Sequence, residues 1–116
     1  MLRKILSGIA ALSIIATAAQ AETGAAAEKF DNPLQRPTRD FVAFCGKPVN
    51  ALSCSTTVTM LDIGAGMTVK GYCAIGTRDM GVASQMIAHW LWQHPELSET
   101  RFADAYLRAT GTLWPC

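Results

Sequence analysis

The chain of 116 residues has few charged side chains, and they do not gather into a run of one sign. Lysine, arginine, aspartate and glutamate together make up 16% of the sequence, with ten basic and nine acidic residues. Proteins that bind nucleic acid or anionic membranes through electrostatics carry a basic stripe or patch. Because no such stripe is present, we expect neither nucleic acid nor a membrane surface as a partner.

The sequence also lacks the short motifs by which many catalytic and metal sites are recognised. It contains no G-x-S-x-G, no H-E-x-x-H and no C-x-x-C. The two histidines, His89 and His94, are five residues apart on one expected helix, so they do not share a face. Asp40, Asp79 and Glu99 are explained by helix starts, where a carboxylate complements the helix dipole. We therefore predict a protein without enzymatic activity, cofactor or metal.

The one long apolar run lies at the start of the chain. Arg3 and Lys4 precede residues 5–16, which are almost wholly apolar, and a small-x-small A-Q-A sequence follows at 19–21. This order is typical of a secretory signal peptide, and the run is too short for a stable membrane span. An uncleaved anchor helix is the alternative. We expect residues 1–21 to direct the chain through the general export pathway into the periplasm and then to be removed.

Residues 22–116 contain no second apolar run long enough to cross a bilayer. Two of the ten basic residues precede this part, which leaves eight basic against nine acidic residues and a net charge of −1. Its length is that of a single domain. Residues 22–37 are small, polar and interrupted by two prolines, so we predict a flexible N-terminal tail followed by one helical domain over 38–116.

The first predicted helix is short. It begins at Thr38, whose side chain suits the N-cap, and it ends at Gly46, shortly before Pro48. Its apolar side consists of Phe41, Val42, Phe44 and Cys45.

The second segment has mixed signals. Residues 55–59, S-T-T-V-T, suit a strand, whereas Val58, Leu61 and Ala65 lie at helical spacing. A lone short strand would have no partner in this chain. We predict a helix over 53–65, followed by a loose connection rich in glycine, at Gly64, Gly66 and Gly71.

The third and fourth predicted helices are amphipathic. The third follows Thr77 as N-cap and ends by His94, because Pro95 follows, and its buried stripe comprises Met80, Ala83, Met86, Ile87, Trp90 and Leu91. The fourth is capped by Ser98 and ends before Pro115, with a stripe of Phe102, Ala105, Tyr106, Ala109 and Leu113. Two such helices joined by a few residues predict an antiparallel hairpin within an all-α, four-helix domain.

Four cysteines follow the predicted signal peptide. An even number in an oxidising compartment predicts two disulfides, and the absence of close Cys/His pairs disfavours the alternative of a metal site. Three connectivities are open. The hairpin brings Cys73 and Cys116 to the same end, and Cys45 faces Cys54 across a short turn. We predict the pairs Cys45–Cys54 and Cys73–Cys116.

Trp92 is the candidate binding residue. At 100° per residue it lies well away from the buried stripe of its helix, on the side that carries Val82 and His89. Exposed tryptophans are common anchors of protein interfaces. We hypothesise that Val82, His89 and Trp92 form part of a partner or dimer surface; the alternative is that Trp92 covers the first or second helix.

Taken together, these features resemble the Tai-type (Rap/Tai) immunity family. They are a helix D-F-V-A-F-C ending at Cys45, a second cysteine that opens the next helix, a third before a helix that ends in H-P-E at 94–96, and a closing W-P-C at 114–116. The resemblance covers about residues 38–116. The sequence is that of a divergent member, because Ser55-Thr56-Thr57 stand where the family usually has a glycine and an aromatic residue.

The resemblance implies binding rather than chemistry. Such proteins are periplasmic and occupy the active site of a cognate cell-wall hydrolase, a peptidoglycan amidase delivered by type VI secretion, often as homodimers. By this resemblance we expect an inhibitor of such an amidase. The alternative is a small periplasmic structural or stress protein, chaperone-like, with many clients and no dedicated effector.

Overall fold

A computed structural model describes residues 29–76 and 78–116. They form four α-helices: α2 (Thr38–Cys45), α3 (Ala51–Thr68), α4 (Met80–Trp92) and α5 (Phe102–Leu113). Two 3₁₀ turns join α2 to α3 and α4 to α5, at Pro48–Asn50 and Pro95–Leu97. Within these ranges there is no β-strand, only one isolated bridge, so the predicted all-α fold is confirmed. The predicted signal peptide and the predicted N-cap Thr77 lie outside the described residues.

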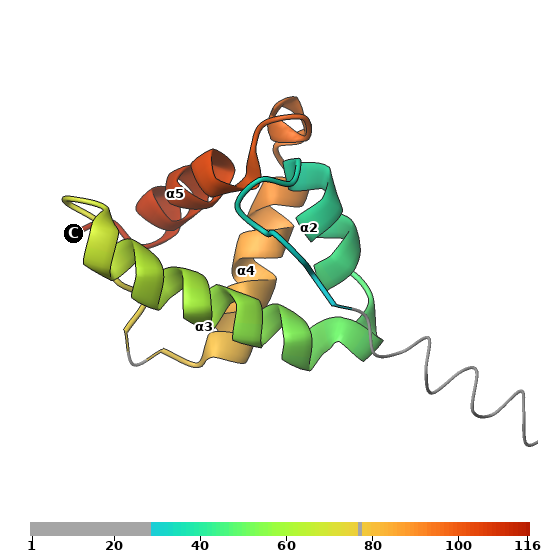
Figure 1. Ribbon diagram of the computed structural model, residues 1–116, viewed down its shortest axis with the longest axis horizontal. Coiled ribbons are helices and arrows are strands. Elements are labelled where there is room, and N and C mark those ends of the chain that lie inside the picture. The colour runs from blue at the N-terminus through green and yellow to red at the C-terminus, as the bar shows by residue number, and fades with distance from the viewer. Residues whose placement is uncertain (1–28, 77) are drawn as a thin grey trace, which may run out of the picture.

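Helix α4 is the central element of the domain. It contacts each of the other three α-helices. Figure 1 shows α3 crossing α4, with α2 and α5 at opposite ends of the arrangement. The side of α4 that these neighbours bury consists of Ala83, Ser84, Ile87, Ala88 and Leu91. Three of these five residues are small, so neighbouring helices can approach α4 closely.

The buried stripe of α4 differs from the prediction at three positions. Met86 is exposed, whereas Ser84 and Ala88, which the sequence pattern did not select, are buried. Ser84 tolerates burial because its hydroxyl donates to the Gly81 carbonyl at 2.9 Å. The stripe therefore lies about one residue away from the position that hydrophobicity alone indicates.

Helix α3 is confirmed and is longer than predicted, 18 residues from Ala51 to Thr68. The strand-like segment forms helix, and within it the hydroxyls of Thr56, Thr57 and Thr59 each donate to the carbonyl four residues earlier, at 2.8–2.9 Å. Val58 of this segment is fully buried in the core. The assignment of Gly64-Ala65-Gly66 to a turn was wrong. Both glycines lie inside α3, at a cost of about 1 kcal/mol each relative to alanine.

At the starts of α2 and α5, the structure differs from the predicted N-caps. Thr38 is the first residue of α2 and does not cap it; its amide and its hydroxyl both donate to the Thr100 carbonyl, at 2.9 and 2.8 Å. Ser98 lies before the start of α5, and its carbonyl instead accepts from the Arg39 amide at 2.9 Å. Backbone groups from a distant segment therefore satisfy the first amides of α2, where the sequence pattern had suggested local side chains.

The same two segments also satisfy the start of α5. The Phe102 amide donates to the Arg36 carbonyl at 2.8 Å, next to the isolated bridge between Pro37 and Arg101. The chain before α2 thus caps α5, and the chain before α5 caps α2. The rings of Phe41 and Phe102 stack beneath this junction, with centroids 4.2 Å apart.

The described part of the predicted tail, residues 29–37, lies against the helices. The ring of Phe30 packs at 5.0–6.2 Å from three core rings, those of Phe41, Phe44 and Phe102. The guanidinium of Arg36 lies over the Phe30 ring at 4.4 Å. The packed structure therefore begins before residue 38. The composition of the segment did not reveal this, because a single aromatic residue does most of the packing.

Both predicted disulfides are confirmed. Cys45–Cys54 joins the end of α2 to the first turn of α3, with Cα atoms 5.4 Å apart. Cys73–Cys116 joins the connection before α4 to the chain after α5, with Cα atoms 5.7 Å apart. The two bonds close loops of different length, with sequence separations of 9 and 43.

We expect Phe102→Ala to destabilise the domain by about 3–5 kcal/mol, because the ring is fully buried and its loss leaves a cavity beside Phe41. Urea denaturation followed by circular dichroism measures this change. Leu52→Ala, at an exposed position of α3, is the matched control and should shift stability by no more than about 0.5 kcal/mol. Equal effects of the two substitutions would contradict the assigned core.

Candidate partner surface

The three residues predicted to bind a partner, Val82, His89 and Trp92, are all exposed on α4. Together with Met86, which was predicted to be buried and is exposed, they form what we call the α4 face. Val82 is 58% exposed and Trp92 is 67% exposed. The His89 and Trp92 rings stack against each other, with centroids 5.9 Å apart. Because Trp92 is exposed to this extent, it does not cover α2 or α3, and the alternative prediction for this residue is wrong.

The α4 face carries no lysine, arginine, aspartate or glutamate, because α4 contains none from Met80 to Trp92. The helix start is fixed by Asp79, whose carboxylate accepts from the Val82 amide at 3.1 Å. An exposed helix side without charge is unusual on a soluble protein, where charged residues normally cover the outer side. The α4 face therefore has the composition of an interface rather than of a solvated surface.

A small hollow of about 200 Å³ adjoins the α4 face. It is lined by residues from the start of α4 and from the chain after α5: Arg78, Asp79, Val82, Ala83, Met86 and Trp114. Trp114 is almost fully buried, and the Arg78 guanidinium lies 5.6 Å from its ring centre. The chain after α5 thus forms one wall of the hollow, and residues of the α4 face form the other.

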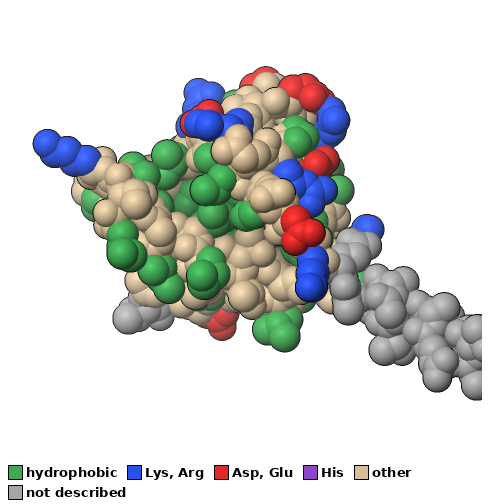
Figure 2. All heavy atoms as spheres, viewed as in Figure 1, with side chains coloured by type: hydrophobic (Ala, Val, Ile, Leu, Met, Phe, Trp, Pro, Cys, Tyr) green, Lys and Arg blue, Asp and Glu red, His purple; other side chains and the backbone are tan. Residues whose placement is uncertain are grey.

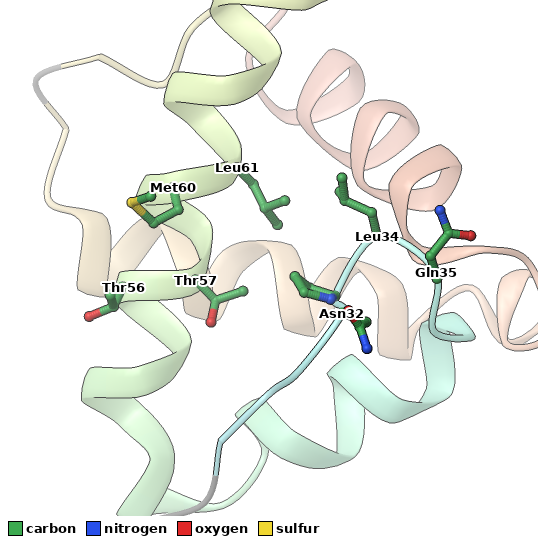
Figure 3. A pocket seen from close by; sticks show the side chains of 8 residues that line it. Asn32, Leu34, Gln35, Thr56, Thr57, Met60 and Leu61 are labelled. Atoms are coloured by element: carbon green, nitrogen blue, oxygen red, sulfur yellow. The ribbon is translucent and has the colours of Figure 1, made fainter.

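A second apolar surface, which we call the α3 groove, was not predicted. Figure 2 shows hydrophobic side chains gathered over α3 and in the hollow beside it. Two adjoining hollows of about 490 and 330 Å³ share Leu34, Met60 and Leu61. In Figure 3, Leu61 of α3 and Leu34 of the segment before α2 point into the space between these two elements. Among the described residues, those that line the two hollows include no charged side chain.

The sequence pattern missed the α3 groove because α3 is apolar on two sides. Val58 faces the core, while Met60 and Met67 are 65% and 81% exposed on the outer side. A helix with this composition has no single apolar stripe, and the early end assigned at residue 65 left out its last three residues, Met67 among them. The signal that could have revealed the groove is the scarcity of charge, since Asp62 is the only charged residue in α3.

The Asp62 carboxylate holds the connection between α3 and α4. Its Oδ1 atom accepts from the Tyr72 hydroxyl and from the Ile75 amide, each at 2.8 Å, and Oδ2 accepts from the Gly76 amide at 3.4 Å. The hydroxyls of Tyr72 and Tyr106 lie 2.8 Å apart, which links this connection to α5. Sequence reasoning gave Asp62 no role, because its partners are ten to fourteen residues away.

Both tyrosines of this network are harder to ionise than free tyrosine, whose pKa is about 10. Burial raises the pKa of Tyr106 to about 12, and the negative charge of Asp62 acts in the same direction. The pKa of Tyr72 is also raised, first by burial and then by its hydrogen bonds with Tyr106 and Asp62. Both hydroxyls are therefore protonated at neutral pH.

The second histidine is a helix-end residue, as the sequence indicated. The His94 ring stacks on Trp90 with centroids 3.7 Å apart, and Nδ1 lies 2.6 Å from the Trp90 carbonyl oxygen at the end of α4. This position satisfies a free carbonyl of the last turn. His89 lies on α4, whereas His94 lies just beyond its end, so the two histidines do not share a helix face.

In the part of the chain that the structure describes, three or more His, Cys, Asp or Glu side chains nowhere come together as a metal-binding group. Among the same residues no helix has the length and apolarity required to cross a membrane. A scan of protein-family models, a search of curated proteins and a search of solved structures each found no match to this chain.

Alkaline pH should lower the stability of the domain through the tyrosine pair. Below pH 10 the tyrosines are protonated in both the folded and the unfolded protein, so their contribution to stability is complete. Between about pH 10 and 12 the unfolded chain ionises while Tyr106 stays protonated in the fold, so the free energy of unfolding falls as pH rises. Urea denaturation at pH 8, 9.5 and 11 measures this slope. Tyr72→Phe removes one ionisable group and should make the slope shallower; an unchanged slope would argue against the coupled pair.

Proposed function

We propose that this protein is an exported binding module that inhibits a peptidoglycan amidase by protein–protein contact, as the Tai-type immunity proteins that it resembles do. The proposal assigns the α4 face to the amidase interface, with Trp92 as its anchor. It assigns no catalytic step, cofactor or metal to this chain. The periplasm is the proposed site of action, and the two disulfides are compatible with that oxidising compartment.

The observation that carries the proposal is the exposed, uncharged side of α4. Tryptophan is among the residues most enriched at the centre of protein interfaces, where its large rigid ring buries much area at a small entropic cost. Trp92 already stacks on His89 in the free protein, so part of the entropic cost of ordering its side chain is met before a partner binds. Val82 and Met86 extend the same apolar side by more than two helical turns.

The experiment is an affinity capture from periplasmic extract and from purified cell-wall amidases, followed by an assay of the captured amidase. The expected result is one stoichiometric amidase whose activity falls on binding. The contrary result, a broad set of clients that bind without a fixed stoichiometry, would favour the chaperone-like alternative. Sedimentation of the protein alone and with the amidase decides whether it acts as a homodimer, as the family resemblance implies.

Trp92→Ala should weaken amidase binding by about 2 kcal/mol or more, which is roughly a thirtyfold increase in Kd, because Trp92 is the largest and most exposed apolar side chain of the α4 face. Calorimetric titration measures the change. Met60→Ala is the matched control: Met60 is equally exposed but lies in the α3 groove. Loss of affinity in Met60→Ala, with Trp92→Ala unaffected, would move the interface to the α3 groove and refute this assignment.

A further inference from the structure

The two disulfides differ in their access to solvent, and we propose that Cys73–Cys116 is a reducible latch that controls the hollow beside the α4 face. In this proposal a dithiol reductant opens Cys73–Cys116 while Cys45–Cys54 stays closed. Opening frees the chain after α5 and removes Trp114, which forms one wall of this hollow. The selective reduction does not depend on the proposed function; only its effect on amidase binding does.

The first step is the difference in burial. Cys45 and Cys54 are 3% and 0% exposed, and both belong to the hydrophobic core between α2 and α3. Cys116 is exposed, and Cys73 is only partly buried. Thiol–disulfide exchange needs direct access of the attacking thiolate to a sulfur atom, so exposed disulfides are the labile ones. Of the two bonds, only Cys73–Cys116 offers that access.

The surroundings of Cys73 also leave room for a reductant. A hollow of about 160 Å³ reaches Cys73 between the connection after α3 and the last turns of α5. Gly71 and Gly111 line it, and a Cβ atom added at either position would meet no atom within 4 Å. A thiol can therefore approach without displacing side chains.

The reaction is a two-electron exchange. A thiolate of the reductant attacks Sγ of Cys116, the more exposed residue of the pair, the Cys73–Cys116 bond breaks, and the Cys73 sulfur leaves as a thiolate that takes up a proton. The second thiol of the reductant then attacks the mixed disulfide and releases Cys116. The protein gains two thiols, and the dithiol is oxidised to its disulfide.

Reduction of Cys73–Cys116 should affect the two chain segments that it joins to different extents. The connection that carries Cys73 stays attached without the bond, because Asp62 still accepts from Tyr72 and Ile75 and the Ile75 side chain is buried. The chain after α5 has fewer anchors. Besides the disulfide, it is held by the Trp114 side chain, which packs at the edge of the core, and by the bond from the Trp114 amide to the Thr110 carbonyl at 2.9 Å. Reduction should therefore release residues 114–116 and leave the four helices in place.

Release of Trp114 removes one wall of the hollow that adjoins the α4 face. Trp114 lines the 200 Å³ hollow together with Val82 and Met86, both members of the α4 face. When Trp114 leaves, the apolar side of α4 widens toward Ala83, which is buried in the closed form. The redox state of one disulfide would in this way set the shape of the proposed amidase interface.

Selective reduction is tested on the purified, fully oxidised protein. Samples are equilibrated with increasing dithiothreitol, quenched with N-ethylmaleimide and mapped by mass spectrometry. We expect a species modified only at Cys73 and Cys116, which forms at a dithiothreitol concentration at least tenfold below that needed to open Cys45–Cys54. Simultaneous modification of all four cysteines, or earlier modification of Cys45 and Cys54, would overturn the latch.

Release of Trp114 is tested separately by ¹⁵N NMR of its indole group. In the reduced protein, and in the double variant Cys73→Ser/Cys116→Ser, indole N–H exchange with solvent should be at least tenfold faster, with unchanged helical circular dichroism. An unchanged Trp114 exchange rate in the reduced protein would overturn the release step. The matched variant Cys45→Ser/Cys54→Ser should lose helical stability instead, because that bond lies in the core.

The coupling to function is tested last, by titrating the amidase against oxidised protein and against the Cys73→Ser/Cys116→Ser variant. A difference in Kd of at least fivefold is expected, and equal values would overturn the coupling. If no amidase binds either form, the proposed function fails, while the alkylation and NMR results still decide whether the latch exists.

Discussion

The domain depends on the reciprocal capping of two helix starts. The segment before α2 supplies the carbonyl that receives the first amide of α5, and the segment before α5 supplies those that receive the first amides of α2. The stacked rings of Phe41 and Phe102 lie at the same junction, so hydrogen bonding and apolar burial reinforce each other there. This arrangement joins residues about sixty positions apart and places α4, which connects the two halves, at the centre.

Charged and uncharged side chains occupy different parts of the surface. Ion pairs gather around that junction, where Arg36 pairs with Asp40, Arg39 with Glu99, and Arg101 with Asp104. Exposed pairs of this kind contribute little stability, about 0–1 kcal/mol each, but they keep the region soluble. The α4 face and the α3 groove lie away from it and are uncharged. Two uncharged apolar surfaces on so small a domain favour a binding role, and substitutions at Trp92 and Met60 separate the two.

Hydrophobic spacing was sufficient for the helices of this fold, because α2, α4 and α5 each bury one side. It also led to both disulfides, since helix order brings the correct cysteines together. The same reasoning failed at Thr38 and Ser98, where capping partners come from across the fold. It also failed at Gly64 and Gly66, which lie inside α3 despite the low helix propensity of glycine. It placed Val82, His89 and Trp92 on an exposed side by periodicity alone.

The sequence by itself determined the helical class, the pairing of the cysteines and the uncharged outer side of α4, because each follows from residue spacing within or between neighbouring elements. Only the tertiary structure decided the role of Asp62, the burial of Phe30, the α3 groove and the unequal exposure of the two disulfides. These features arise from groups distant in sequence that meet through packing, and no local pattern encodes which distant surfaces will meet.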